Sequence, residues 1–220
     1  MNISTRLPKK YANEQVLVVQ YASLSELLPT VGVWPVRDKL LDLVAKPGIM
    51  RRDQAEMTTA VTQLVAYYIV VNESRLLTHR RTRRQPEKRL TAVRAIGLSG
   101  HMTTSDLQTL LTRDLFHAGE HTGYANRELA EEVAVRVSSK HPITLRGFIW
   151  EPIDDFGKQH LGLIYIVPAE AEFRVLEPGL IGEAQFSTLP EISRSVDAYT
   201  SWSRLLLQSN LLTEALTVEG

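Results

Sequence analysis

The chain has 220 residues, a formal net charge of zero at pH 7 and a hydrophobic content of 44%, which is enough for an ordinary buried core. The balanced charge gives the molecule no overall field for DNA, RNA or an anionic membrane, so any such contact must be local. No cysteine is present, which excludes disulfides, thiolate zinc sites and a cysteine nucleophile.

The N-terminal text, MNISTRLPKKYANEQ, lacks the continuous apolar stretch of a signal peptide. No apolar run approaches the ~20 residues that would cross a bilayer. The sequence therefore predicts a cytoplasmic protein without membrane contact.

The first part of the chain alternates between segments typical of strands and segments typical of helices. β-branched and apolar residues predict a strand over 14–24, and helical spacing before a Pro-Gly stop predicts a helix over 34–48. A buried strand over 58–72, a turn over 72–75 and a second strand over 75–83 form a predicted hairpin.

The middle of the chain carries two predicted helices after a strand. Residues 89–102 read as a strand that runs into a glycine-containing loop. Leucines at helical spacing predict a helix over 105–119 with Ser105 as its N-cap, and a further helix is expected over 123–137.

Three β-rich runs, 143–152, 160–169 and 172–178, precede a final amphipathic helix over 197–212. Irregular alternation of strands and helices favours an α+β layered domain over a doubly wound sheet. Neither a G-x-G-x-x-G nor a Walker pattern occurs, which argues against nucleotide binding by those routes.

An acidic cluster stands out in the stretch RELAEEVAV. On a helix Glu128, Glu131 and Glu132 fall within an arc of roughly 100°, beside an apolar stripe formed by Leu129 and Val133. Like charges at this spacing repel. Two interpretations stay open from the helix alone: a solvated face, or a cage for a hard divalent cation such as Mg²⁺.

This stretch resembles the core of the Nudix box, G-x5-E-x7-R-E-U-x-E-E-x-G-U, where U is aliphatic. The text from Arg127 to Val135 matches R-E-U-x-E-E-x-G-U at every position except the glycine, where Ala134 stands. Upstream, Gly100 is followed after five residues by Asp106, a carboxylate where the pattern has glutamate. The segment between Asp106 and Arg127 holds twenty residues rather than seven, an expansion of thirteen.

Landmarks outside the box are similar to a branch of the superfamily, the predicted MutT-type phosphoesterases. These landmarks are the sequence segments GLSGHM, GFIWEP and HLGLIYIV and the final pair Trp202-Ser203. The resemblance implies a Nudix-like α/β/α sandwich with a mixed sheet and an expanded loop–helix, over residues 61–220. Residues 1–60 are expected to be an N-terminal extension packed on the same domain. The extension has three open roles: extending the sheet, covering the substrate cleft or forming the surface of a homodimer.

The resemblance also implies a metal-dependent reaction and assigns residues to it. Glu128 and Glu132 are expected to ligate Mg²⁺ or Mn²⁺ directly, with Glu131 coordinating or orienting. Glu131, Glu132 and Arg127 are the expected catalytic residues, and Arg127 is expected to pair with a neighbouring carboxylate. The backbone around Ser99 and Gly100 would offer a carbonyl to the metal, and Asp106 is a further candidate.

Four residues are expected to bind the substrate: Gly100, His101, Arg80 and His160. Each histidine can equally be a hydrogen-bonded structural residue. Arg80 belongs to the basic run 79–89, which reads either as a solvated hairpin end or as an electropositive rim for phosphates. A long nucleic acid is not expected there, because the run lacks interleaved aromatics.

The general base stays open at this point. Later carboxylates that are eligible, with no preference among them, are Glu151, Asp154, Asp155, Glu172 and Glu183.

Three functions compete. The first is hydrolysis of a diphosphate bond in a nucleoside diphosphate derivative or related organic pyrophosphate, with a small nucleotide-like substrate. The second is a catalytically silent Nudix-fold module that binds a nucleotide or a protein, which the long insertion and Ala134 favour. The third is chemistry like that of isopentenyl diphosphate isomerase, which the absence of cysteine disfavours.

Overall fold

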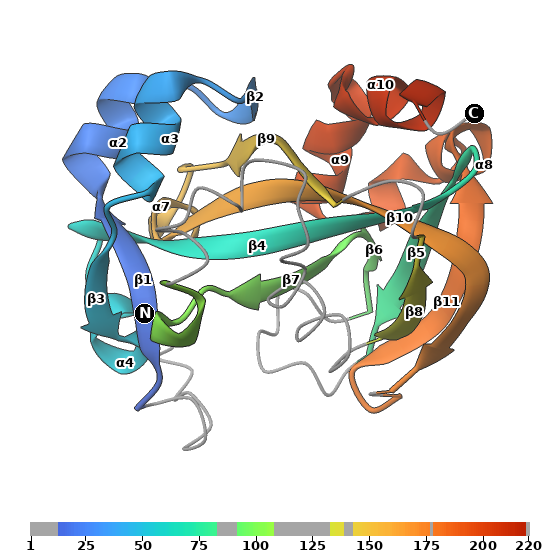
Figure 1. Cartoon of the computed structure of the whole chain (residues 1–220), viewed down its shortest axis with the longest axis horizontal. Coiled ribbons are helices and arrows are strands. Elements are labelled where there is room, and N and C mark those ends of the chain that lie inside the picture. The colour runs from blue at the N-terminus through green and yellow to red at the C-terminus, as the bar shows by residue number, and fades with distance from the viewer. Residues whose placement is uncertain (1–12, 83–91, 108–132, 139–142, 177, 219–220) are drawn as a thin grey trace.

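The computed structural model of the chain describes residues 13–82, 92–107, 133–138, 143–176 and 178–218. Its strands join in one mixed sheet whose central path runs in the order β11-β5-β4-β10-β9-β2 (Figure 1). Strand β4 (Val61–Asn72) and strand β10 (His160–Val175) pair in parallel at its centre. Strand β4 is almost wholly buried and β10 is buried over residues 160–169, where the two strands pair, as expected for strands covered on both faces.

Residues 13–60 add strands to this sheet. Strand β1 (Gln15–Gln20) pairs with β4, and strand β3 (Gly48–Arg51) pairs with β1. Strand β2 (Gly32–Pro35) pairs with β9 (Thr144–Trp150) at the other edge. Of the three roles open for this part of the chain, the structure shows extension of the sheet.

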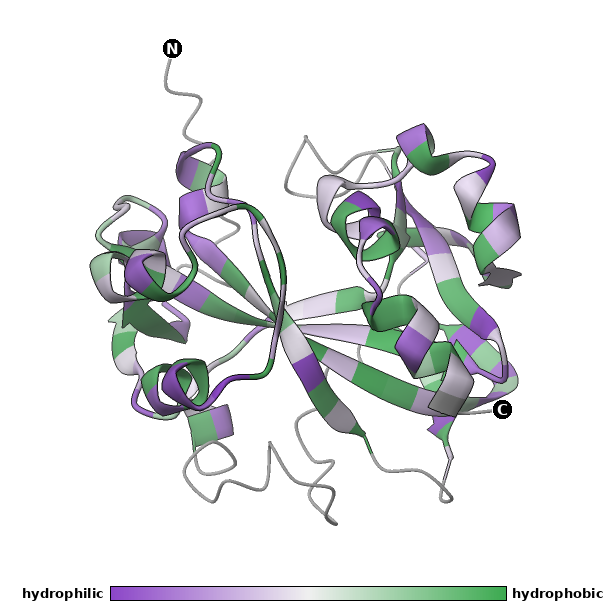
Figure 2. Cartoon of the chain, turned by 90° about the horizontal axis from the view of Figure 1, so that it is seen from above, coloured by the Kyte–Doolittle hydropathy of each residue, from purple (hydrophilic) through white to green (hydrophobic). Residues whose placement is uncertain are grey.

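Helices lie in two separate groups with the central strands between them (Figure 2). One group holds α2 (Tyr21–Leu27) and α3 (Asp38–Val44). The other holds α9 (Ser201–Gln208) and α10 (Leu211–Val218). The short helices are α4 (Arg52–Ala55), α7 (Asp155–Lys158) and α8 (Leu189–Ser193), with 3-10 turns η2 (Thr104–Asp106) and η3 (Val196–Ala198).

Two hydrophobic clusters cover opposite faces of β4 because its side chains alternate. Leu64, Ala66, Tyr68 and Val70 belong to the larger cluster, with α2 and α3. The intervening Tyr67, Ile69 and Val71 belong to the second, with α9 and α10. The layered α+β architecture predicted from the sequence is confirmed, and none of the described helices is long and apolar enough to cross a membrane.

The hairpin of β4 and β5 (Arg75–Arg81) confirms the predicted strands and turn. Several other boundaries were predicted wrongly. The first predicted strand ends at Gln20, because the residues after it form helix α2, which buries Leu24 in the core. The text Trp34-Pro35 closes β2, and the helix after it begins only at Asp38.

Around Gly100 the predicted loop is a strand. Residues 94–101 form two short strands, β6 (Arg94–Ile96) and β7 (Leu98–His101), separated by Gly97. Thr103, and not Ser105, caps the turn that follows, because its side chain and Asp106 bond each other's backbone in a capping box.

The helix predicted over 123–137 is wrong over its last five positions, and residues 123–132 lie outside the described part of the chain. Residues Val133–Val137 form strand β8, which pairs with the far end of β10 (Figure 1). The text VAVRV alternates with period two, and β-branched residues favour the pleated sheet. The runs predicted as separate strands at 160–169 and 172–178 are joined in the single strand β10, which ends at Val175, and β11 (Ile181–Thr188) follows.

Candidate active site

The predicted metal ligands Glu128, Glu131 and Glu132, with Arg127, lie outside the described residues. The structure fixes the two flanks of the segment that carries them. Val133, directly after Glu132, is fully buried in the larger hydrophobic cluster, and Leu107 packs against the same cluster. Full burial of a valine contributes about 1.5–3 kcal/mol. Both flanks of the segment therefore contact one core, Val133 within it and Leu107 against it.

Ala134, which stands in place of the box glycine, carries no backbone strain. It lies in β8 opposite Arg174. Among the described residues, the non-glycine positions with positive φ are Glu73, Ala92 and Glu183. Ala134 is therefore not in the left-handed conformation that would favour glycine at this position.

Gly100 lies within β7, opposite Ala66 of β4. The kink that leads into β7 requires glycine at 97, where φ is 90° and an added Cβ would lie 2.9 Å from the Tyr68 carbonyl oxygen. This kink sets the position of Ser99, whose Oγ accepts a hydrogen bond of 3.3 Å from Arg81 Nη2.

Asp106 is buried and bonded to its own turn. Its Oδ2 accepts hydrogen bonds from Thr103 N at 2.6 Å and from Thr103 Oγ1 at 2.8 Å. These contacts assign the carboxylate a capping role at the start of η2. They hold the chain where it leaves the sheet after β7.

The predicted substrate-binding histidines lie side by side. The rings of His101 and His160 meet edge to face with centroids 5.3 Å apart. His160 Nδ1 lies 2.7 Å from the Phe156 carbonyl oxygen, which makes Nδ1 the donor, and its Nε2 lies 3.5 Å from Gln63 Nε2. The structure thus brings these two residues together, and the His160 ring also packs on Phe156.

His101 is held in its neutral form. Burial lowers the pKa of His101 well below its ordinary range, and the nearby Arg52 guanidinium and His160 lower it further. Gly100 and His101 are neighbours on a strand, so they point to opposite faces of the sheet. A ligand held on the Gly100 face does not therefore meet the His101 ring directly.

Arg80, the remaining predicted substrate-binding residue, is exposed and ion-paired. Its Nη1 lies 2.9 Å from Glu183 Oε1, and the other carboxylate oxygen of Glu183 lies 3.4 Å from Arg94 Nη1. The structure does not place Arg80 beside Gly100, His101 or His160.

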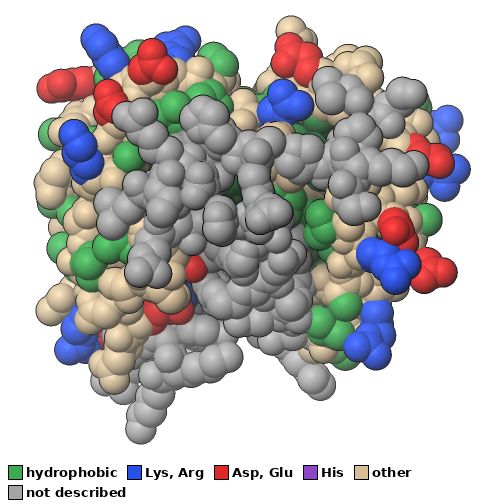
Figure 3. Space-filling view, in the orientation of Figure 1, with side chains coloured by type: hydrophobic (Ala, Val, Ile, Leu, Met, Phe, Trp, Pro, Cys, Tyr) green, Lys and Arg blue, Asp and Glu red, His purple; other side chains and the backbone are tan. Residues whose placement is uncertain are grey.

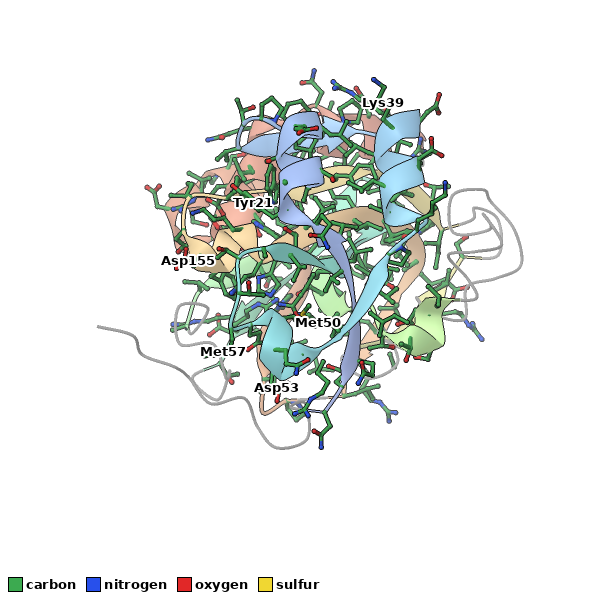
Figure 4. The ribbon with its side chains drawn as sticks, turned by 90° about the vertical axis from the view of Figure 1, so that its left-hand side faces the viewer. Tyr21, Lys39, Met50, Asp53, Met57 and Asp155 are labelled. Carbon is green, nitrogen blue, oxygen red and sulfur yellow. The ribbon has the colours of Figure 1, made fainter. Side chains whose placement is uncertain are left out.

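The candidate general bases have different settings. Asp154 caps α7 by accepting a bond of 2.7 Å from Gly157 N, and Asp155 is exposed at the edge of the molecule (Figure 4). Glu172 is exposed on β10, Glu151 is partly buried, and Glu183 lies between two arginines. Among the residues that the structure describes, no group of three or more histidine or acidic side chains is placed to hold a metal.

Two residues that sequence reasoning did not single out belong to this region. Arg81 is partly buried and reaches Ser99. His79 is 2% exposed, and burial together with Arg81 and Arg94 lowers its pKa to about 3. The signal available in the sequence was strand alternation, which places His79 and Arg81 on one face of β5 and Arg80 on the other.

Comparisons with known proteins give a fold. Neither a family model nor a curated protein matches the sequence. The crystal structure of Tm1382, a proposed Nudix hydrolase, superposes with a TM-score of 0.70 at 19% identity, over 93% of this chain and 100% of that chain. The MutT Nudix hydrolase of Burkholderia pseudomallei gives a TM-score of 0.43 at 20% identity, over 67% and 96%. The Nudix domain of Shewanella oneidensis NrtR with ADP ribose gives 0.47 at 14%, over 70% and 88%.

The likeness to Tm1382 covers nearly the whole chain, and the chain therefore has the Nudix fold. This fold confirms the Nudix-like architecture expected from the text RELAEE and its flanking landmarks.

Proposed function

We propose that this protein hydrolyses a phosphoanhydride bond in a nucleoside diphosphate derivative or a related organic pyrophosphate, with Mg²⁺ or Mn²⁺ as cofactor. The observation that carries the proposal is a coincidence of sequence and fold. The hexad RELAEE, residues 127–132, immediately precedes β8 in a chain that has the Nudix fold.

The donor set suits the proposed ion. Three carboxylates at i, i+3 and i+4 provide hard oxygen ligands, which Mg²⁺ and Mn²⁺ prefer. Glu128 and Glu132 would ligate directly and Glu131 would coordinate or orient, while Arg127 would pair with a neighbouring carboxylate. A bound divalent ion would neutralise the charge of the diphosphate and make bound water more acidic.

A small substrate fits the surface better than a long nucleic acid. On the face shown in Figure 3, acidic and basic side chains of the described residues are interspersed, and no field of one sign forms. Long nucleic acids need a continuous row of cations to neutralise their phosphates.

One of the two observations that favoured a catalytically silent module no longer supports it. Ala134 was a reason to doubt the box, but the residue lies unstrained in β8. The thirteen-residue expansion remains as the motive for that alternative, and hydrolysis is the function that the remaining observations favour.

A hydrolysis screen tests the proposal. Wild type, E132Q and the control E170Q would be assayed for phosphate or pyrophosphate release from nucleoside diphosphate derivatives with Mg²⁺ or Mn²⁺. Glu170 is an exposed glutamate that pairs with Arg136, so its substitution should leave the rate unchanged. E132Q should lose about 100-fold or more in kcat, because a metal ligand contributes several kcal/mol to the transition state. Equal rates for E132Q and wild type would refute the proposed role of the carboxylates.

A further inference from the structure

Adjacent arginines at the end of β5 have opposite surroundings. Arg80 is exposed and bonded to Glu183. Arg81 is partly buried, and its single hydrogen bond through the side chain to a described residue is the one to Ser99 Oγ. Among the described residues, the buried Arg81 Nε atom has no hydrogen-bond partner and no carboxylate pairs with this guanidinium.

His79 lies on the same face of β5, two residues before Arg81. The side chain is almost fully buried, and its Nδ1 also has no hydrogen-bond partner among the described residues. With its pKa at about 3 the ring is neutral at physiological pH, so it adds no second positive charge beside Arg81.

An unpaired and partly buried guanidinium is unfavourable by itself. Removing a charge from water costs several kcal/mol unless an opposite charge or full hydrogen bonding compensates, and arginines in such positions are normally paired. The nearby Arg94 is already engaged with Glu183 and Thr78. The arrangement is therefore that of a site whose anionic partner is a ligand.

Phosphate is the anion whose geometry and place in the fold agree with this site. A guanidinium binds two phosphate oxygens through parallel N–H groups. Arg81 reaches β7 at Ser99, which directly precedes Gly100 on the strand that leads toward the segment carrying the acidic hexad. A nucleic-acid backbone would need further unengaged cations, and the described neighbours Arg80 and Arg94 both bond Glu183.

We propose that Arg81, supported by Ser99 and His79, binds a phosphate group of the substrate. This assignment rests on the proposed diphosphate hydrolysis and moves the phosphate-binding role predicted for Arg80 to its neighbour. Arg81 supplies the charge and the forked donors. The hydroxyl oxygen of Ser99 accepts a hydrogen bond that orients the guanidinium. The neutral His79 ring lies on the same face of β5 and adds no competing positive charge.

Calorimetric titration with pyrophosphate in the presence of EDTA tests the site without turnover. Wild type should bind, R81M should bind about tenfold more weakly or worse, and R81K should lie between them, since lysine keeps the charge and loses the fork. R75M removes an exposed arginine from the other end of β5 and should stay within about twofold of wild type. R80M should change affinity less than R81M.

Thermal unfolding separates ligand binding from a structural role. Without pyrophosphate, R81M should melt at the same temperature as wild type or higher, because the substitution removes an uncompensated charge. Pyrophosphate should raise the Tm of wild type but not that of R81M. A clear loss of Tm in R81M, its failure to fold, unchanged pyrophosphate affinity in R81M, or no binding by wild type at millimolar pyrophosphate would each overturn the assignment.

E132Q distinguishes this inference from the proposed function. It should bind pyrophosphate without metal as wild type does, although it should lose turnover. Binding through Arg81 in a protein that hydrolyses nothing would refute the hydrolase alone. Turnover that depends on Glu132 but not on Arg81 would refute the phosphate site alone.

Discussion

The end of the sheet beside α4 and α7 differs from the end formed by β5, β6 and β7 in how its cations are compensated. At the first end, Arg52 bonds Glu14 at 2.9 Å and Glu56 at 3.1 Å. At the second end, Arg81 has no carboxylate partner among the described residues.

This difference separates framework from site. Figure 4 shows the first end, with Asp53 on α4, Met57 just after that helix and Asp155 on α7. Compensated charges there stabilise the fold and need no ligand. Polar groups without a partner at the second end lower the stability of the fold unless an anionic ligand binds there. Such a loss of stability is typical of functional sites.

The largest expected effect comes from acid, through His79 at the uncompensated end. Its pKa in the folded protein, about 3, is below the ordinary 6.5, so the unfolded chain binds the proton more readily. The contribution of His79 to stability is complete above pH 6.5 and is lost progressively as pH falls toward 3. The slope is about 1.4 kcal/mol per pH unit within this window.

Urea unfolding at pH 7.5, 5.5 and 4.5 measures this slope. H79Q has no titrating ring, so its free energy of unfolding should fall less steeply with pH than that of wild type, whatever the cost of the substitution at pH 7.5. Parallel curves for the two proteins would show that His79 is not buried in its neutral form.

The next effect is expected at the compensated end. R52M leaves the carboxylates of Glu14 and Glu56 without their shared cation, and the Arg52 side chain is 16% exposed. The loss should be about 2 kcal/mol, between the values typical of exposed and of buried ion pairs. Chemical denaturation measures it directly, and R81M measured beside it should show no such loss.

R51M provides the smallest effect and the matched control. Arg51 bonds Asp53, but both side chains are well exposed at 45% and 35%, so the loss should stay below about 0.5 kcal/mol. If R51M and R52M were equally destabilised, the compensation of Arg52 would not be the source of stability at this end.

The sequence predicted the parts of this fold that follow from one continuous pattern. The apolar, β-branched text of β4 and the turn after it allow a single interpretation. The text VAVRV does not, because Val133 fits the stripe of a preceding helix as well as the first position of a strand. Val133 pairs with Val175 of β10, which is distant in sequence, and this pairing places Val133 in a strand.

The site shows the same limit. The hexad RELAEE can be recognised locally, because its predicted chemistry depends on spacing between residues close together in sequence. The contrast between Arg80 and Arg81 cannot be recognised from the local sequence. It depends on which face of β5 meets β7 and which face meets the solvent near Glu183. Likewise, the neighbourhood of His101 and His160 follows from the pairing of both β7 and β10 with β4.

Titration with Mn²⁺ monitored by electron paramagnetic resonance tests the central claim most directly, because it counts ions on the carboxylates without needing the natural substrate. The proposal predicts that wild type binds Mn²⁺ and that a variant with Glu128, Glu131 and Glu132 all changed to glutamine binds it at least about tenfold more weakly, with an unchanged circular dichroism spectrum. Equal Mn²⁺ affinity in the two proteins would contradict it.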